Sequence, residues 1–526
     1  MKTAKDYSGA KTVYFKPEIK LCPHCNAPLK RSHVAWQKHI LTLKTIFDAT
    51  SYAYRCSNKT CPQPQTIYRS MEAEMLSLKY YQFSLDVIAK VGHLRFQEHA
   101  TIRQTRRTLK KRFKLQISRS EVNLLCQAYL ALIQANRQQD TEFIEKLQSN
   151  GGVILSIDGL QPEKGNETLW ILRDVQTGET LLAKNLSYAD TESIAALLKK
   201  VKALGIPVKS VVSDGQRSIR LAVAKEVPGV PHQLCHFHFL RNIAKPVSDM
   251  DRALKVDLKK KVRGIRTAEK KLVLLGNDEK AKVILQYCEA IHVALRDDGV
   301  YPLKPGGLRL WRCLRKIQQS IQKSNKLQPD SNLERLLKVL SIVDDLTPRY
   351  RRVRRLYKLI FEANAILGQE AKAEKVQSDM QTYVDGLMNL HFRRQEEEAA
   401  VLNILKFTAS YWEGLFYHYD HKEIPRTNND LEVYNRSLKA AHRKTTGRAS
   451  CQGYIVRYGA YVALLDSSLC QRETLVGLRS VSYEAFRLCY REIRSFRLRL
   501  SFKRSLSKDL EGFLLSQELS WAKTAV

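Results

Sequence analysis

The sequence predicts a multidomain protein of the α+β class, and three observations carry that prediction. The chain has 526 residues, 44% of them apolar, which is enough for roughly three to four domains. Short β-rich runs gather in residues 151–238, where they alternate with helical segments. Residues 71–150 and 239–420 instead carry apolar side chains at helical spacing, so two helical regions flank a mixed α/β region.

The first 70 residues carry four cysteines in two short-spaced pairs. Two tight turns of this kind can present four thiolates to one tetrahedral Zn²⁺. The predicted ligands are Cys22, Cys25, Cys56 and Cys61. Three histidines could compete as ligands, namely His24, His33 and His39. The other interpretation is unpaired surface thiols. The eleven cysteines of the chain do not form a disulfide framework, which favours a reducing cytoplasm.

Residues 71–150 resemble a helix-turn-helix unit. Ser118 or Ser120 can cap a helix that has Glu121 in its first turn. The helix before it and the start of this one are cationic, through Arg103, Arg106, Arg107, Lys110, Lys111, Arg112 and Arg119. One interpretation is a recognition helix that enters the major groove of DNA. The alternative is an ordinary helical hairpin with a solvated charged face.

The segment 151–238 predicts strands and helices in alternation. The expected strands are VILSID, TLWILRDV, TLLAKNL, VKSVVSD and HQLCHFH. The second and third flank QTGE, a turn signal for a hairpin. A helix is expected over Ser193–Leu204, ended by Gly205 and Pro207.

The remaining chain is expected to be mostly helical. Residues 239–420 have no convincing strand and are interrupted near Pro302–Gly307. Residues 421–466 contain a helix with Glu432 and then return to apolar, α/β-type sequence. Residues 467–526 are expected to be helical and basic.

The charge balance points to a polyanionic partner. Lys and Arg number 88 against 53 for Asp and Glu, a formal net charge of +35. An excess of this size is the electrostatic footprint of a nucleic-acid-binding protein, although a merely soluble basic protein is the other interpretation. No apolar stretch approaches the ~20 residues of a membrane span, and the first 20 residues lack the apolar core of a signal peptide.

Three carboxylates occupy positions that suit two-metal phosphodiester chemistry. Asp158 and Asp214 each end an apolar run, and Glu432 lies early in a helix. Carboxylates from two strands and a helix can hold two Mg²⁺ or Mn²⁺ ions. The competing interpretation is that each Asp-Gly pair is a turn and that Glu432 is solvated.

The helix of Glu432 has two expected faces. Asn428 and Asn429 can cap it, and its buried stripe is expected to consist of Leu431, Tyr434 and Leu438. Glu432, Asn435, Arg436 and Lys439 share the other face, where Arg436 and Lys439 could bind phosphate.

These motifs together resemble those of DDE transposases with a ribonuclease-H-like core, in particular the Mutator-like group and bacterial insertion-sequence transposases. The resemblance rests on ILSIDGL, VVSDGQRS, TNNDLEVYNRSLK and a Cys-x-x-His element formed by Cys235 and His238. It implies that Asp158, Asp214 and Glu432 are catalytic and that His238 contacts the scissile phosphate or orders the acidic residues. A buried core role for Cys235 and His238 remains the alternative.

The resemblance also implies a domain order. It comprises a zinc-binding module (1–70), a helix-turn-helix DNA-binding domain (71–150), a catalytic core in two parts (151–240 and 421–466), an all-α insertion domain (241–420) and a basic helical C-terminal region (467–526).

The implied activity is cleavage of transposon ends at terminal inverted repeats, followed by joining of these ends to target DNA. The partners would be double-stranded DNA and further copies of the chain, as a homodimer or higher oligomer. The expected location is the cytoplasm, at the nucleoid of a bacterial host. The alternatives are an inactive transposase that acts as a DNA-binding regulator, and a structure-specific ribonuclease-H-like nuclease.

Overall fold

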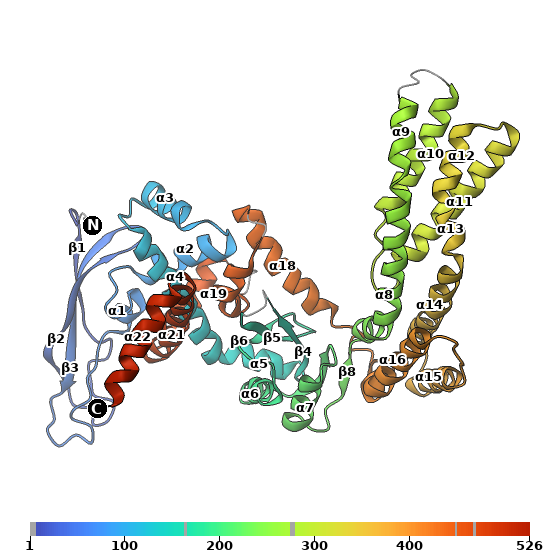
Figure 1. Ribbon diagram of the computed structural model, residues 1–526. Coiled ribbons are helices and arrows are strands. Elements are labelled where there is room, and N and C mark those ends of the chain that lie inside the picture. Colours follow the sequence, from blue (N-terminus) through green and yellow to red (C-terminus); the bar gives the residue numbers. More distant parts are fainter. Residues whose placement is uncertain (1–6, 162–165, 274–278, 448–449, 466–469, 526) are drawn as a thin grey trace. The chain divides into compact units, whose positions relative to one another are not determined.

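The computed structural model describes residues 7–161, 166–273, 279–447, 450–465 and 470–525. It is a mixed α+β, multidomain chain that is mostly helical (Figure 1). Two compact units are distinguished. Unit 1 comprises Met1–Val153, Asp158–Pro207 and Asp430–Val526, and unit 2 comprises Ile154–Ile157 and Val208–Asn429.

The N-terminal part of unit 1 contains a three-stranded sheet that was not predicted from the sequence. Its strands are β1 (Lys11–Phe15), β2 (Leu29–Leu41) and β3 (Ile46–Cys56), in the order β1-β3-β2. β1 runs parallel to β3, and β2 runs antiparallel to it. The sheet buries a small apolar cluster that consists of Phe15, Ile40, Ala49 and Ala73.

The helices expected in residues 71–150 are confirmed. They are α1 (Met71–Leu76), α2 (Leu85–Gly92), the π-helical turn η1 (His93–Gln97), α3 (Ile102–Phe113), α4 (Arg119–Gln139) and α5 (Thr141–Ser149). Ser118 caps α4 in a capping box with Glu121, as predicted. α2 packs closely on α4. The approach is so close that a Cβ added at Gly92 would lie only 2.3 Å from the ring of Tyr129.

The five strands expected in residues 151–238 are present. They are β4 (Val153–Leu160), β5 (Thr168–Asp174), β6 (Thr180–Leu186), β7 (Val208–Ser213) and β8 (His232–Leu234), in the order β6-β5-β4-β7-β8. β5 and β6 form the predicted antiparallel hairpin, and β7 pairs with β8 in parallel. The last strand was predicted too long: it ends at Leu234, because a helix begins at His236.

Two helices of this region follow the sequence signals. α6 (Thr191–Lys202) is capped by Asp190 and is followed by Gly205, whose φ is +70°. α7 (Arg217–Glu226) begins three residues after Asp214.

Unit 2 continues as helices. They are α8 (His236–Val262), α9 (Ile265–Val273), α10 (Glu279–Arg296), α11 (Gly306–Leu327), α12 (Ser331–Leu340), α13 (Ile342–Asp345), α14 (Thr347–Leu367), α15 (Ala373–Met388), α16 (Gln395–Tyr411), η2 (Trp412–Gly414) and α17 (Tyr417–Asp420). α8 packs against α11, α14 and α16 around one apolar core. Within the described part of residues 241–420 there is no strand, as expected from the sequence.

The C-terminal part of unit 1 is helical. Its elements are α18 (Asn429–Thr446), α19 (Gln452–Val462), α20 (Gln471–Arg479), α21 (Tyr483–Lys508), α22 (Leu510–Ala522) and η3 (Lys523–Ala525). The α/β character expected for residues 421–466 is wrong for the described residues of that range, which form only helices and turns. The apolar residues of α19 pack on β5 and β6 instead of forming a strand. Among the described helices, none combines the length and the apolar composition needed to cross a membrane.

Candidate functional site

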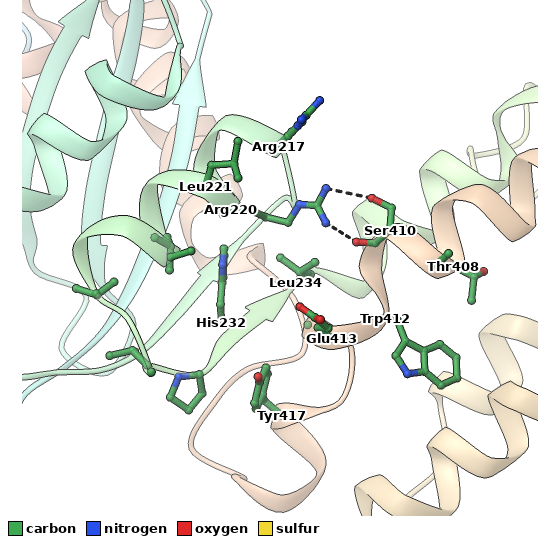
Figure 2. A pocket seen from close by; sticks show the side chains of 18 of the residues that line it. Arg217, Arg220, Leu221, His232, Leu234, Thr408, Ser410, Trp412, Glu413 and Tyr417 are labelled. Carbon is green, nitrogen blue, oxygen red and sulfur yellow. Dashed lines mark hydrogen bonds between the residues drawn. The ribbon is translucent and has the colours of Figure 1, made fainter.

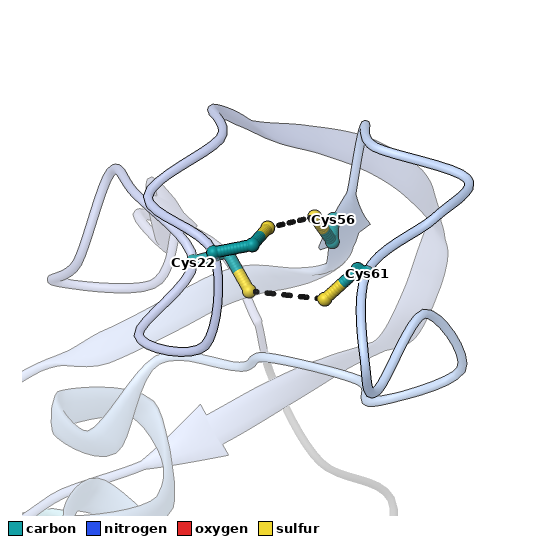
Figure 3. Close-up of side chains that lie close together, drawn as sticks. Cys22, Cys56 and Cys61 are labelled. Carbon is teal, nitrogen blue, oxygen red and sulfur yellow. Dashed lines mark hydrogen bonds between the residues drawn. The ribbon is translucent and has the colours of Figure 1, made fainter.

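The four N-terminal cysteines converge, although their two pairs are 31 residues apart along the chain at Cys25 and Cys56. Their Sγ atoms all lie within 4.8 Å of one another. The Sγ atoms of Cys22 and Cys61 are 3.8 Å apart, and those of Cys25 and Cys56 are 3.4 Å apart. Figure 3 shows the labelled thiols directed toward a common centre. A tetrahedral site with Zn–S bonds of about 2.3 Å has edges of about 3.8 Å, so these thiols could bind zinc structurally.

The surroundings of the thiols fit a metal-thiolate site. The amide N–H groups of Asn58 and Gln63 donate to the Sγ atoms of Cys56 and Cys61, respectively. A hydrogen bond with Tyr68 lowers the pKa of Cys22 to about 6, whereas burial raises the pKa of Cys56 to about 12. A bound cation would be needed to hold the Cys56 group as a thiolate.

The competing histidines are not part of this cluster. His24 is exposed, His33 contacts Ser32 on the exposed side of β2, and the ring of His39 stacks on Tyr7. Among the described residues, no second group of three or more His, Cys, Asp and Glu side chains lies close enough to bind one metal ion.

Asp158 lies within β4, two residues before the strand ends at Leu160. The prediction that it ends the strand is therefore wrong, and the Asp-Gly turn interpretation fails here as well. Its carboxylate is half-buried and oriented by two donors. Oδ1 accepts from the Gly159 amide at 2.8 Å, and Oδ2 accepts from Asn435 Nδ2 at 2.9 Å.

Asp214 directly follows β7, as predicted, and is half-buried. Its Oδ1 accepts from the Gln216 amide at 2.9 Å, and its carbonyl oxygen accepts from Tyr411 Oη at 2.6 Å. Gly215 has a φ of +80°. The turn interpretation thus describes this backbone correctly.

The helix α18 carries Glu432 in its first turn, where the side chain is half-buried. Leu431 and Leu438 are buried and Tyr434 is half-buried, as predicted for the apolar stripe. Asn435 was placed on the opposite, phosphate-binding face, but it is 6% exposed and binds Asp158. The other two polar positions of that face remain accessible, since Arg436 is exposed and Lys439 is half-buried.

Asn428 precedes α18 and uses its side chain to bind β4. Its Oδ1 lies 3.0 Å from Ser156 Oγ, and its Nδ2 donates to the Ile157 carbonyl at 3.1 Å. Its backbone amide donates to Cys235 Sγ at 3.3 Å. Neither Asn428 nor Asn435 was identified as a positioning residue from the sequence. The available signal was their spacing of seven residues, with Asn428 just before an amphipathic helix and Asn435 within it.

Cys235 and His238 lie at the start of α8 and not in a strand. Cys235 is buried, and its amide donates to the Ser213 carbonyl at 2.8 Å. Cys235 therefore joins the residue before Asp214 to the residue before α18, a structural role in the core. His238 is half-buried in the first turn of α8.

His236, between these two residues, was not predicted. It is 4% exposed, and its Nε2 lies 2.7 Å from the Leu415 carbonyl. Burial lowers its pKa to about 4, and burial lowers that of the neighbouring His418 to about 4 as well. Both rings are therefore neutral near pH 7.

A large cavity of about 1230 Å³ lies in unit 2, beside α7 and β8 (Figure 2). Arg220 reaches across it and donates to the Ser410 carbonyl and to Ser410 Oγ. His232 lies on another wall, 2.8 Å from Ser213 Oγ, and burial lowers its pKa to about 4. These contacts support the strand that leads to Asp214, because Ser213 is the residue before it.

The cations predicted in residues 71–150 to bind DNA are partly brought together. A cavity of about 380 Å³ is lined by Arg103, Arg106, Arg107, Lys110 and Arg119. Arg106 Nε donates to the Ile117 carbonyl, which fixes the joint between α3 and α4. Lys111 and Arg112 are exposed but do not line this cavity.

The cationic surface belongs to α3 and the first turn of α4. α3 buries only Thr105 and Leu109 of its length. Most residues of α4 between Val122 and Ala135 are buried in the core. The body of α4 is therefore mostly inaccessible from outside, and α3 offers the accessible cationic face.

Comparison with known proteins agrees with the resemblance drawn from the sequence. A search of curated proteins gives no match. The model of a family described as "Transposase, Mutator family" matches residues 183–287. This range includes β7, Asp214, β8 and the Cys235–His238 element. Residues 183–287 thus carry a Mutator-family transposase domain, which supports a Mutator-like transposase.

Proposed function

We propose that the protein binds the terminal inverted repeats of a transposon, cleaves the DNA at its ends and joins these ends to target DNA. The observation that carries the proposal is the Mutator-family match over residues 183–287. We further propose that Asp158, Asp214 and Glu432 are the catalytic carboxylates, and that His238 contacts the scissile phosphate or orders the acidic residues.

The order of the strands supports a ribonuclease-H-like core. Asp158 lies on β4, the first strand of the five-stranded sheet along the chain and the middle one in space. Asp214 follows β7, the fourth strand, which neighbours β4 in the sheet order. This is the strand position that the DDE resemblance assigns to each carboxylate, with Glu432 on a later helix.

The donor chemistry of the three residues fits Mg²⁺ or Mn²⁺. Carboxylate oxygens are the ligands that these hard cations prefer. The Asp158 carboxylate is held by the Gly159 amide and by Asn435, and the Asp214 carboxylate by the Gln216 amide. Two bound ions would activate the attacking oxygen and stabilise the leaving one. The chain's own part is to hold the carboxylates in fixed directions and to align the phosphodiester.

Alignment of DNA is assigned to the cationic residues. In this proposal the α3 surface binds backbone phosphates of the transposon end, while Arg436 and Lys439 contact phosphates near Glu432. The cation-lined cavity at α3 supports this assignment. Phosphate contacts of this kind position DNA without reading its sequence. The structural zinc of the cysteine cluster would keep the N-terminal module folded for end recognition.

The decisive experiment is a cleavage and strand-transfer assay with the purified full-length protein, Mg²⁺ and duplexes that carry the ends of the element encoding it. Wild-type protein should release 3′ ends and join them to target DNA. Asp158→Asn and Glu432→Gln should each abolish both steps while end binding, measured by fluorescence anisotropy, is retained.

Matched controls make the result specific. Asp345 and Glu74 are exposed carboxylates on α13 and α1. Asp345→Asn and Glu74→Gln should cleave like the wild type. End binding without cleavage in any divalent cation would contradict the proposal and favour a DNA-binding regulator. Cleavage that survives Asp158→Asn would exclude the assigned carboxylate.

A further inference from the structure

The last two helices form a hairpin that has almost no core of its own. The first half of α21 is anchored, since Phe486, Cys489, Ile493 and Phe496 are buried and this helix packs on α4. From Arg497 onward α21 has no buried residue, and α22 has none at all. The contacts between the two helices include an edge-on packing of Phe502 and Phe513, with ring centroids 5.6 Å apart.

The exposed surface of this hairpin is strongly apolar. In α22 the exposed fractions are 57% for Leu510, 48% for Leu514, 59% for Leu515, 59% for Leu519 and 79% for Trp521. In α21, Leu498 is 62% and Phe502 is 54% exposed. These α22 side chains lie on more than one face of the helix. Isolated helices of this length are marginal in water, and a helix that is apolar all round is normally buried.

The charges of the hairpin indicate what covers it. α22 and its cap carry Asp509, Glu511 and Glu518, with no cation until Lys523. The facing helix α21 is cationic, with Arg499, Lys503, Arg504 and Lys508 exposed. An acidic apolar helix disfavours contact with DNA phosphates, and its acids complement a cationic apolar helix of the α21 type.

We propose that α21 and α22 are the self-association surface of the protein, and that the partner is the same hairpin of a second copy. In a two-fold arrangement, α22 of each copy packs on α21 of the other, which gives a four-helix bundle. The exposed leucines, Phe502 and Trp521 become its core, and Glu511 and Glu518 face the cations of the partner's α21. The inference deepens the oligomer expected of the proposed function, and it rests on that function only for this expectation.

The test measures association of the full-length protein in the absence of DNA. Sedimentation velocity over a concentration series should show a dimer for the wild type. Leu515→Glu combined with Leu519→Glu keeps helix propensity but places two charges in the bundle core. This variant should raise the dimer Kd at least about tenfold, as removal of central apolar contacts does. Leu327→Glu, at a residue of α11 that is 88% exposed, is the matched control and should leave the Kd unchanged.

Charge reversal distinguishes a second copy from any other partner. Glu511→Arg with Glu518→Arg should weaken the dimer, and so should Lys503→Glu with Arg504→Glu. All four changes in one chain should restore it, because each copy then supplies both reversed surfaces. A monomeric wild type, or a dimer that none of these variants weakens, would overturn the inference. A wild-type protein that forms the dimer but does not cleave DNA would contradict the proposed function and leave this inference intact.

Discussion

Asp158 and Asp214 follow similar apolar runs and are each followed by glycine, yet their surroundings differ. Asp158 lies inside a strand, and its carboxylate is held by the Gly159 amide and also by the side chain of Asn435, 277 residues away along the chain. Asp214 lies in a turn, and its carboxylate is held by the amide two residues later. The distant contact at Asp214, from Tyr411, reaches the backbone carbonyl and not the carboxylate.

The difference teaches that similar sequence patterns can orient a carboxylate in two ways. The direction of the Asp158 side chain depends in part on a packed helix, so it can be changed by substitutions in α18. The direction of the Asp214 side chain depends on local turn geometry, so it can be changed by substitutions at Gly215. The four predictions that follow test this comparison.

The largest expected effect is at the two glycines. A Cβ at Gly215 would lie 2.6 Å from the ring of Tyr411, and its φ of +80° is unfavourable for alanine. Gly215→Ala should lower the free energy of unfolding by about 2–4 kcal/mol. A Cβ at Gly159 would meet Thr168 and Trp170 at 3.1 Å with no such backbone strain, so Gly159→Ala should cost about 1–2 kcal/mol. Urea denaturation followed by circular dichroism measures both, and equal losses would contradict the comparison.

The next effect is at Asn435. Asn435→Leu removes the donor to Asp158 Oδ2 and leaves the apolar packing of α18 in place. Cleavage should fall about 10–100-fold, as is usual when a residue that orients a metal ligand is lost, while end binding is retained. Ser437→Ala on the exposed face of the same helix is the control. Unchanged cleavage in Asn435→Leu would show that Asp158 needs no positioning from α18.

A pH effect is expected in unit 2, near Asp214. Burial lowers the pKa of His232 and of His236 to about 4 from the ordinary value near 6.5. Between these two pH values the unfolded chain therefore binds more protons than the folded chain. The free energy of unfolding should be highest above pH 6.5 and should decline as the pH falls toward 4. The midpoints of urea denaturation at pH 7.5, 5.5 and 4.5 measure how steeply stability depends on pH. His232→Gln should make this pH dependence weaker. An unchanged pH dependence in this variant would contradict the role given to His232.

The smallest effect is expected at Tyr411. Tyr411→Phe removes the hydroxyl that donates to the Asp214 carbonyl and accepts from Asn242 Nδ2. Stability should fall by about 1 kcal/mol, the usual net value of one such hydrogen bond. Cleavage should change by less than Asn435→Leu changes it, since the carboxylate keeps its own turn contact. A larger loss of cleavage than in Asn435→Leu would reverse the comparison.

Local signals predicted the elements that depend on neighbouring residues. The Ser118–Glu121 capping box, the QTGE hairpin and the short-spaced cysteines all act over a few residues, and each has the expected structure. The three strands of the N-terminal sheet were missed, because β2 is mostly exposed or half-buried and has no clear alternation of apolar and polar residues.

Contacts between distant segments could not be predicted in this way. The bond from Asn435 to Asp158 and the bond from Asn428 to β4 join residues more than 270 positions apart. On the sequence alone, a polar residue in an amphipathic helix is expected to face solvent. The end of β8 was misplaced for a related reason, since His236 is buried by contact with Leu415 and not by a strand neighbour.

The bond between Cys235 and Asn428 has a consequence for how the chain can vary. The 192 residues between these two positions leave and return at the same point, where the Asn428 amide meets Cys235 Sγ and the His236 amide donates to the Arg426 carbonyl at 3.0 Å. A segment whose ends already touch can be lengthened, shortened or exchanged at little cost in loop-closure entropy. The length of the helical segment 236–427 can therefore change without moving β8 before it or α18 after it, provided that the contacts of Ser410 and Tyr411 with Arg220 and Asp214 are kept.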